Sequence, residues 1–361
     1  MLYFIFEAIS LNSTIREKSL KTYIKLKALL YSLALSLAVI CLSSCGKTVV
    51  SEPGDGLGRD RVQPSETTDS ETTMETESET TADTASDGKI WDFADGKYVF
   101  NFPERSDEGL ATIDEMYDMS TARFDDQPDD WFFGKTVRDN DTGEVTYVWD
   151  RSADTLETLK KYRTIYRGDE TRKVCYLTFD CGYEYGTMDT ILDTLKEKQV
   201  SATFFVNGHY VRSASDKIQR MIDEGHIIGN HAVNHYDLTG VSVDTFLEEV
   251  QGLEELYYET LPDAPPMLYF RPPSGDCNEW VLKFADKLGY KTVMWSWAYK
   301  DFDTDAQPDV DETLEKVMTG LHNGEVMLLH PESKTNTEML GKMIDKIRDA
   351  GFEILPICDI E

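Results

Sequence analysis

Two histidines four residues apart form the first candidate for a reactive site. His231 and His235 occur in the segment NHAVNH. On one turn of a helix, residues four apart project from the same side, so the two imidazoles would be able to share one metal ion. A bound divalent metal activates water for hydrolysis at neutral pH. Such a pair also arises by chance on a polar surface, so its meaning depends on what the fold brings beside it.

Four further side chains suit acid–base chemistry, and each comes just after an apolar run. Asp180 follows VCYLTF, Arg271 follows LYF and His330 follows EVMLL. Asp301 comes shortly after the apolar segment TVMWSW. Taken singly, each of them has an ordinary structural explanation, such as a helix cap, a rigid turn or a half-buried histidine.

Short apolar strands alternate with amphipathic helices from Lys173 onward. Continuous apolar strands separated by helices are typical of a parallel sheet buried on both faces. The pattern predicts an α/β fold of about seven such units, either a barrel or an open doubly wound sheet. We expect strands at 174–179, 202–206, 226–230, 268–271, 292–297, 325–330 and 352–357, and helices at about 187–198, 215–224, 243–259, 278–288, 311–321 and 337–349.

The candidate residues all fall at the carboxyl ends of these strands. In parallel α/β folds the connections from every strand converge at that end, and sites are built there. Residues far apart in the sequence are therefore expected to meet at one mouth. In strand order, they are Asp180, His231, His235, Arg271, Asp301 and His330.

The first 45 residues have the pattern of a secretory signal. Basic residues between Arg16 and Lys27 precede an apolar run at 28–42, and small residues lead to Cys45. The cysteine directly after Leu-Ser-Ser resembles the bacterial lipoprotein signal, which implies lipidation of Cys45 and an extracytoplasmic location at the cell membrane. A plain signal peptide or a transmembrane anchor is the alternative.

The segment 46–88 is rich in Ser, Thr, Glu and Asp and contains no aromatic residue. It has too few apolar side chains for their burial to offset the conformational entropy lost on folding, so we predict a disordered tether. Aromatic residues resume in 89–172, which we expect to be a small extension packed on a catalytic domain at 173–361. The formal net charge of −31 repels phosphates and excludes a nucleic-acid partner. We expect a monomer without a disulfide framework.

From about 173 to 358, the sequence resembles the polysaccharide deacetylases of the NodB-homology type, carbohydrate esterase family 4. LTFDCG is similar to the family's Thr-Phe-Asp-Asp motif, NHAVNH to His-x-x-x-His, RPPSG to Arg-Pro-Pro, KDFD to Asp-Trp and MLLH to Leu-x-His. Segments such as LTFDCGYEYG and YFRPPSG resemble the branch that acts on muramic acid during synthesis of spore-cortex δ-lactam. The resemblance implies a distorted (β/α) barrel with about seven repeats.

The same resemblance implies metal-dependent removal of acetyl groups from the amino sugars of a cell-wall glycan, peptidoglycan in particular. His231 and His235 would hold a divalent metal such as zinc or cobalt. Asp180 would act as the general base, and His330 would protonate the departing amine.

Other residues would support or contact these groups. Arg271 would hold Asp180 by charge-assisted hydrogen bonds, and Asp301 would orient His330. Leu328, beside His330, would form part of the pocket for the acetyl methyl group. The expected substrate-binding residues are Leu328, Phe302, Glu184, Pro272 and Pro273.

Two positions depart from the family pattern. Cys181 stands where the second aspartate would supply a third metal ligand. Its thiolate would be able to bind zinc, or a neutral thiol would leave the metal to two histidines, water and substrate. Phe302 replaces the tryptophan of the fourth motif, which keeps an aromatic wall but loses the indole donor.

Two other functions remain open on the sequence alone. Cys181 is compatible with a glycan-binding lipoprotein that has lost its metal and its activity. The retention of an acid, a base and their supports argues against that function. No single residue of the sequence distinguishes amide hydrolysis from hydrolysis of O-acetyl esters.

Overall fold

The computed structural model describes residues 90–102, 115–116, 129–130, 135–138, 145–148 and 153–360. The expected signal segment 1–45, its Cys45 and the tether 46–88 lie outside the described residues. None of the described helices is both long and apolar enough to cross a membrane.

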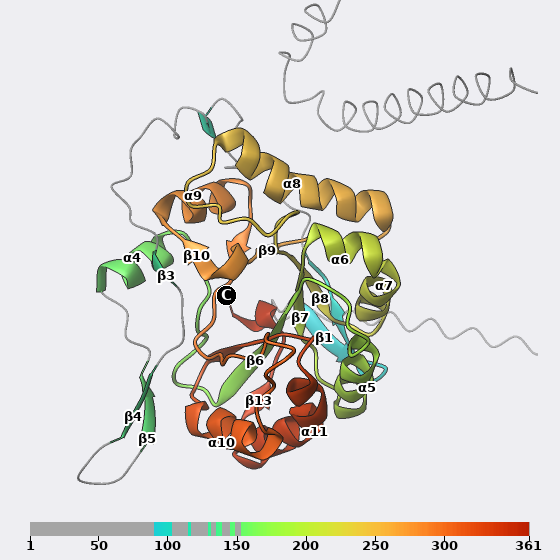
Figure 1. The fold of residues 1–361 in the computed structure, drawn as a ribbon, viewed down its shortest axis with the longest axis vertical. Coiled ribbons are helices and arrows are strands. Elements are labelled where there is room, and N and C mark those ends of the chain that lie inside the picture. The colour runs from blue at the N-terminus through green and yellow to red at the C-terminus, as the bar shows by residue number, and fades with distance from the viewer. Residues whose placement is uncertain are drawn as a thin grey trace, which may run out of the picture. The chain divides into compact units, whose positions relative to one another are not determined.

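A curled parallel sheet forms the centre of the fold (Figure 1). Neighbouring strands follow the order β11-β9-β8-β7-β6-β12, and β13 also pairs with β6. The strands are β6 (Val174–Cys181), β7 (Thr203–Val206), β8 (Ile227–Asn230), β9 (Tyr269–Phe270), β11 (Lys291–Thr292), β12 (Glu325–Leu329) and β13 (Glu353–Ile354).

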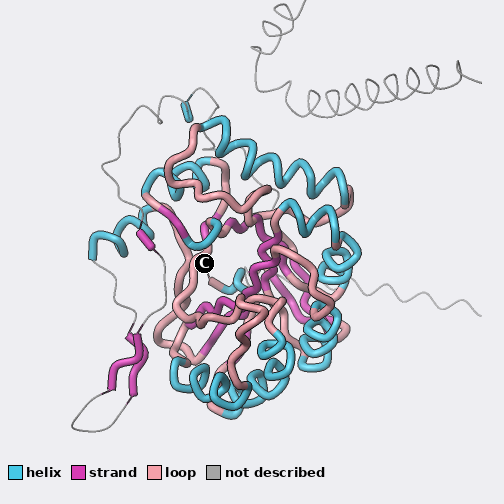
Figure 2. The backbone as a smooth tube through the Cα atoms, viewed as in Figure 1, coloured by secondary structure: helices cyan, strands magenta, loops and turns pink. Residues whose placement is uncertain are grey.

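Helices surround the strands on the outside of the sheet (Figure 2). Side chains of Asn207, Ser242, Asn278, Asp309 and Ser333 cap the amino ends of five of them by accepting backbone N–H bonds. The helices are α5 (Met188–Lys198), α6 (Gly208–Ser213), α7 (Ser215–Asp223), α8 (Val243–Thr260), α9 (Glu279–Lys287), α10 (Val310–Gly320) and α11 (Lys334–Asp349), with short 3₁₀ turns η3 (Pro273–Gly275) and η4 (Ile357–Asp359).

Side chains of β6 divide alternately between two buried clusters, because successive residues of a strand point to opposite faces. One cluster also contains side chains of the outer helices, and its members from β6 are Cys175, Leu177, Phe179 and Cys181. Val174 and Tyr176 belong to a second cluster, together with Leu328. Asp180 follows their alternation and therefore lies on the face of β6 opposite to Cys181.

The segment that follows β11 pairs with β12 and so continues the curled sheet. Trp297 forms a parallel bridge with Met327, and the Ser296 and Trp297 amides donate to Val326 O at 2.9 and 3.2 Å. The sheet is therefore a distorted barrel, as the sequence predicted.

Described parts of 89–172 contact this barrel. The strands β1 (Trp91–Ala94) and β2 (Lys97–Phe100) form a hairpin, and Lys97 Nζ donates to Asp223 O at 2.8 Å. Arg163 Nη2 donates to Asp286 Oδ1 at 2.7 Å. The remaining elements of this part are β3 (Asp129–Asp130), which pairs with β10 (Asp276–Cys277), the hairpin of β4 (Lys135–Arg138) and β5 (Val145–Val148), and α4 (Ala153–Lys161).

Several sequence predictions differ from the observed elements. Helix α6 was not expected, and the strand predicted at 292–297 is regular only as β11. Residues two apart on a regular strand share a face, but the chain is irregular after β11, so Trp295 and Trp297 enter different buried clusters. Both are buried, as expected of core residues.

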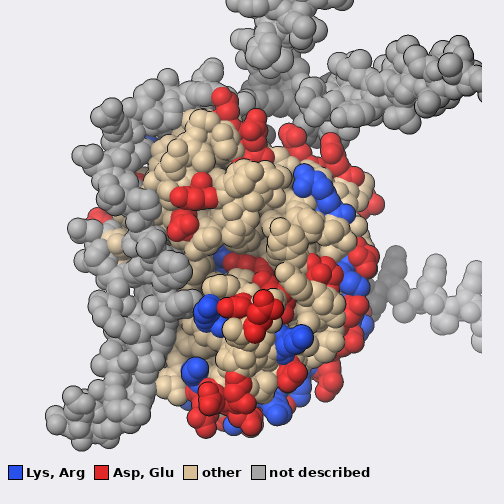
Figure 3. Space-filling model, viewed as in Figure 1, with Lys and Arg blue, Asp and Glu red and all other residues tan. Residues whose placement is uncertain are grey.

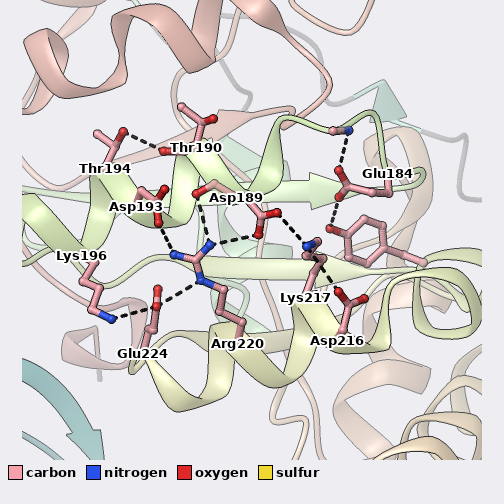
Figure 4. Close-up of polar contacts among 12 residues, drawn as sticks. Glu184, Asp189, Thr190, Asp193, Thr194, Lys196, Asp216, Lys217, Arg220 and Glu224 are labelled. Carbon is pink, nitrogen blue, oxygen red and sulfur yellow. Dashed lines mark hydrogen bonds and ion pairs between the residues drawn. The ribbon is translucent and has the colours of Figure 1, made fainter. Parts of the chain in front are cut away.

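Surface charges form local networks on the outer helices. Arg220 of α7 pairs with Asp189 and Asp193 of α5, and Lys217 also pairs with Asp189 (Figure 4). Exposed pairs of this kind contribute about 0–1 kcal/mol each, so the buried clusters dominate the stability of the barrel.

Candidate active site

A buried ion pair joins the ends of β6 and β9. Arg271 Nη1 donates to Asp180 Oδ1 at 2.7 Å, and the guanidinium is fully buried. Burial by itself raises the pKa of Asp180, but Arg271, His231 and His330 outweigh burial and lower it. Asp180 is therefore a carboxylate at neutral pH.

The guanidinium of Arg271 is fixed on several sides. Its Nε donates to Val293 O at 2.9 Å and its Nη2 to Met294 O at 3.1 Å. Its centre lies 4.2 Å from the centroid of the Phe205 ring. A Cβ at Gly229 would lie 2.5 Å from that ring, so the glycine leaves the space in which Phe205 packs. These contacts make the position of Asp180 rigid.

His231 and His235 lie close together, but the helical turn predicted for them is wrong. Residues 231–240 form a loop, in which Ala232 and His235 have positive φ angles of 61° and 58°. The two ring centroids are 4.8 Å apart and the rings meet edge to face. His231 is buried and His235 is exposed.

Polar side chains from β8 and α8 hold this loop in place, and the sequence analysis did not identify them. Asn230 Oδ1 accepts from Ala232 N, and Asn230 Nδ2 donates to Val250 O. Both carboxylate oxygens of Glu249 accept hydrogen bonds from Asn234, at 2.7 Å from the backbone N–H and 2.6 Å from the side chain. No local sequence signal pairs Glu249 with a loop 15 residues earlier.

His231 is oriented with one nitrogen directed toward Asp180. Its Nδ1 lies 2.8 Å from Arg271 O, and because a carbonyl only accepts, Nδ1 carries the hydrogen. Its Nε2 keeps a lone pair and lies 3.5 Å from Asp180 Oδ2. Burial lowers the pKa of His231 to about 4 despite the nearby Asp180 carboxylate. The ring is therefore neutral at pH 7.

His330 follows β12 and is held by Asp301. Asp301 Oδ1 lies 2.7 Å from His330 Nδ1, and Asp301 Oδ2 accepts from His330 N at 2.7 Å and from Asn336 Nδ2 at 2.6 Å. Burial by itself lowers the pKa of His330, but Asp301, with help from Asp180, raises it to about 9. His330 is therefore protonated at neutral pH, and Asn336 is a supporting residue that the sequence analysis missed.

The His330–Asp301 pair makes stability depend on pH in one direction. The folded pKa of about 9 exceeds the ordinary value of 6.5, so protonated His330 stabilises the fold fully below pH 6.5. That contribution is lost as the pH rises through about 9. We expect Asp301→Asn to lower the His330 pKa toward 6.5 and to flatten the pH dependence of unfolding in this window. Urea unfolding at several pH values, compared between wild type and variant, measures the effect, and equal slopes would contradict it.

Comparisons with known proteins identify the family of this chain. Residues 167–293 match the family model described as polysaccharide deacetylase. Bacillus subtilis (strain 168) has a peptidoglycan-N-acetylmuramic acid deacetylase, PdaA, that is 39% identical over 202 residues, covering 56% of this chain and 76% of PdaA. The solved structure of Bacillus subtilis PdaA, a family 4 carbohydrate esterase, superposes with a TM-score of 0.59 at 35% identity, over 65% of this chain and 97% of that one.

The chain belongs to the polysaccharide deacetylase family. It is thus an enzyme, a hydrolase of carbohydrate esterase family 4. A solved CE4 family pseudoenzyme from Bacillus anthracis is also similar, with a TM-score of 0.52 at 27% identity, covering 62% of this chain and 76% of that one. The family therefore contains an inactive relative, so membership in the family does not by itself assign a role to each site residue.

Deacetylases of this family generally depend on a metal, and the two histidines of this chain fit one in part. The neutral His231 ring offers the Nε2 lone pair, and the His235 ring lies beside it. Within residues 90–102, 115–116, 129–130, 135–138, 145–148 and 153–360, no three His, Cys, Asp or Glu side chains are grouped to hold a metal. In the part of the chain that the structure describes, a metal would find two imidazoles, and no third ligand is grouped with them.

The Cys181 side chain is turned away from the face of β6 that carries Asp180. Its side chain is fully buried in the cluster behind β6, on the face opposite to Asp180. Burial raises the pKa of the Cys181 thiol well above its usual value, with Glu332 and Asp180 adding to the effect. Burial of this kind disfavours the thiolate that would bind zinc.

The expected substrate-binding residues differ in how much of each side chain is exposed. The Phe302 ring is about half exposed and lies edge-on to His330, with centroids 5.6 Å apart. Leu328 is nearly buried and pairs in register with Thr178 of β6. Pro272 and Pro273 are buried and shape the turn after Arg271, so they offer the substrate little surface.

Glu184, an expected substrate-binding residue, lies in the loop that follows β6 of this deacetylase. Its Oε1 accepts from Gly186 N at 2.6 Å, and its Oε2 accepts from Tyr210 Oη at 2.9 Å (Figure 4). Both oxygens are thus occupied in shaping the loop between β6 and α5.

Proposed function

We propose that this enzyme removes N-acetyl groups from amino sugars of cell-wall peptidoglycan, with N-acetylmuramic acid as the preferred sugar. The observation that carries the proposal is the pairing of an ionised Asp180 with a protonated His330 at one end of the barrel. The choice of sugar rests on the similarity to the Bacillus subtilis N-acetylmuramic acid deacetylase. Two further relatives, from Bacillus cereus and Listeria monocytogenes, are named peptidoglycan-N-acetylglucosamine deacetylases at 28% and 29% identity.

Hydrolysis of an acetamide needs a base for the attacking water and an acid for the leaving amine. Asp180 is unprotonated because Arg271 stabilises its charge, so it can accept the proton of water. His330 is protonated because Asp301 stabilises the imidazolium, so it can donate a proton to the sugar nitrogen. Each group is in the required state before the substrate binds.

His231 and His235 would hold the divalent metal, zinc or cobalt among the candidates. When bound, it would supply Lewis acidity for the acetyl carbonyl and lower the pKa of a coordinated water. Arg271 positions two of these groups at once, because its side chain fixes Asp180 and its carbonyl fixes the tautomer of His231. Leu328 and Phe302 would contact the acetyl group and the sugar.

We also propose that the enzyme works outside the cytoplasm as a monomer, with its catalytic domain tethered through lipidated Cys45. This location rests on the signal-like segment and the acidic tether that follows it. Metabolic labelling with a fatty-acid analogue tests it: label is expected on the wild type and not on Cys45→Ala.

Acetate release from defined substrates tests the proposed activity. The full chain is incubated with peptidoglycan fragments, chitooligosaccharides and acetylated xylan, with zinc or cobalt and with chelator. We expect faster release from N-acetylmuramic acid than from N-acetylglucosamine, and loss of activity in chelator. Absence of release from every substrate would refute the enzyme function, and activity unaffected by chelator would refute the metal.

A catalytically inactive glycan-binding protein is the second candidate, because Cys181 is buried in the core cluster and a similar solved protein is a CE4 family pseudoenzyme. The intact Asp180–Arg271 and His330–Asp301 pairs favour the enzyme, since binding alone requires neither a base nor an acid. The same assay separates the two, because an inactive binder would retain glycan affinity without releasing acetate.

A further inference from the structure

Glu332 is a carboxyl group at the active site that the sequence analysis did not identify. It lies two residues after His330, on the connection from β12 to α11. The carbonyl of the preceding residue, Pro331, accepts from Thr187 Oγ1 at 2.6 Å. Thr187 ends the loop that follows Asp180 and Cys181 on β6. Glu332 is therefore at the junction of the two connections that carry the base and the acid.

One oxygen of this carboxyl group is buried without a partner. Among the described residues, three carboxylate oxygens are buried with no hydrogen bond, namely Glu224 Oε2, Glu325 Oε1 and Glu332 Oε2. Glu224 and Glu325 each bind a basic side chain through the other oxygen. In the part of the chain that the structure describes, Glu332 has no ion-pair partner. A buried acceptor left unpaired is unfavourable, so it marks a place where a ligand would supply a donor.

The charges that act on Glu332 are those of the active site. Burial raises the pKa of Glu332, His330 opposes this, and Asp301 and Asp180 add to it. Glu332 in turn acts on His330 and Cys181. Figure 3 shows acidic side chains in and beside a hollow near the centre of the face in view. Glu332 therefore lies within electrostatic range of Asp180, Asp301 and His330.

The substrate atom expected beside His330 is the acetamido nitrogen, because His330 has to protonate it for the amine to leave. That nitrogen carries one N–H donor, whereas the corresponding oxygen of an O-acetyl ester carries none. We propose that Glu332 is a specificity-determining residue whose Oε2 accepts the substrate N–H and so selects amides over esters. This inference rests on the proposed function and adds the group that distinguishes amide from ester.

The physical basis is the cost of an unpaired buried acceptor. With an amide bound, Glu332 Oε2 gains a donor, and with an ester it stays unpaired. Sites built around a substrate hydrogen bond reject analogues that lack the donor much more strongly than apolar pockets reject size variants. Glutamine at 332 would retain an acceptor oxygen of similar reach, whereas leucine would not.

The test compares kcat/KM for an N-acetyl sugar and an O-acetyl ester in wild type, Glu332→Gln and Glu332→Leu. We expect Glu332→Leu to lower the amide-to-ester ratio at least tenfold and Glu332→Gln to retain most of it. Glu338 is an exposed carboxylate on helix α11, which begins just after Glu332. Glu338→Leu is the matched control and should leave the amide-to-ester ratio unchanged. Without substrate, Glu332→Leu should unfold at the same temperature as wild type or higher, because it removes an unpaired buried oxygen.

Three results would overturn the inference. Equal loss of amide and ester turnover in Glu332→Leu would show a general role in catalysis. A weaker zinc affinity of that variant, measured by calorimetry, would make Glu332 a metal ligand instead. A wild type that releases acetate from esters but from no amide would refute the proposed function itself, which separates that failure from a failure at Glu332.

Discussion

Replacing Asp180 by asparagine is expected to lower acetate release roughly 10²- to 10⁴-fold, the usual range for loss of a general base. Asparagine has nearly the same shape and still accepts a hydrogen bond from Arg271 Nη1, but it cannot take a proton from water. The loss should therefore appear in kcat, with a smaller change in KM. Initial rates with a saturating N-acetyl substrate measure it.

Asp189→Asn provides the matched control for this prediction. Asp189 is an exposed carboxylate at the start of α5, where it pairs with Lys217 and Arg220 (Figure 4). Its replacement removes the same charge from the same protein outside the site, so activity should stay within about twofold. If Asp180→Asn kept comparable activity while remaining folded by circular dichroism, Asp180 would not be the base.

Replacing Arg271 by methionine is expected to lower the free energy of unfolding by about 3–5 kcal/mol. The change leaves the buried Asp180 without its partner and leaves the Val293 and Met294 carbonyls without their donors. The pKa of Asp180 should rise, because burial then acts with less opposition. Urea denaturation measures the stability, and activity should fall with it because the base is no longer fully ionised.

Arg163→Met is the control, because Arg163 pairs with Asp286 on the surface. Loss of such an exposed pair costs about 0–1 kcal/mol. The double variant Arg271→Met with Asp180→Leu should recover most of the stability lost in Arg271→Met, because no unpaired charge remains, but none of the activity. Similar losses for Arg163→Met and Arg271→Met would contradict the importance assigned to the buried pair.

Much of the barrel could be read from the sequence because its signals are local. Apolar runs marked β6, β7 and β12. The helices predicted at 215–224, 278–288 and 337–349 end close to glycines of positive φ, namely Gly225, Gly289 and Gly351. The bounds of the shortest strands were predicted least accurately. β11 and β13 have only two residues each, since irregular segments complete their contacts.

The loop that carries the two histidines shows where a local pattern misleads. The spacing of four residues predicted a helical turn. The two histidines are close together as predicted, but they lie in a loop. The rings approach because Asn230 and Glu249 hold a loop with two positive φ angles. Those contacts involve a helix that comes later in the chain, so no pattern within NHAVNH encodes them.

The reactive residue types, their order and their placement at strand ends follow from the sequence, because strand–helix alternation brings successive strand ends to one mouth. The tertiary structure decided their states. Extension of β6 through Cys181 turned that thiol to the opposite face from Asp180, since neighbouring strand residues alternate. Charged partners from distant segments ionised Asp180 and protonated His330 against the effect of burial, and burial left one oxygen of Glu332 unpaired. Such effects depend on distances between segments remote in sequence, which only the folded chain defines.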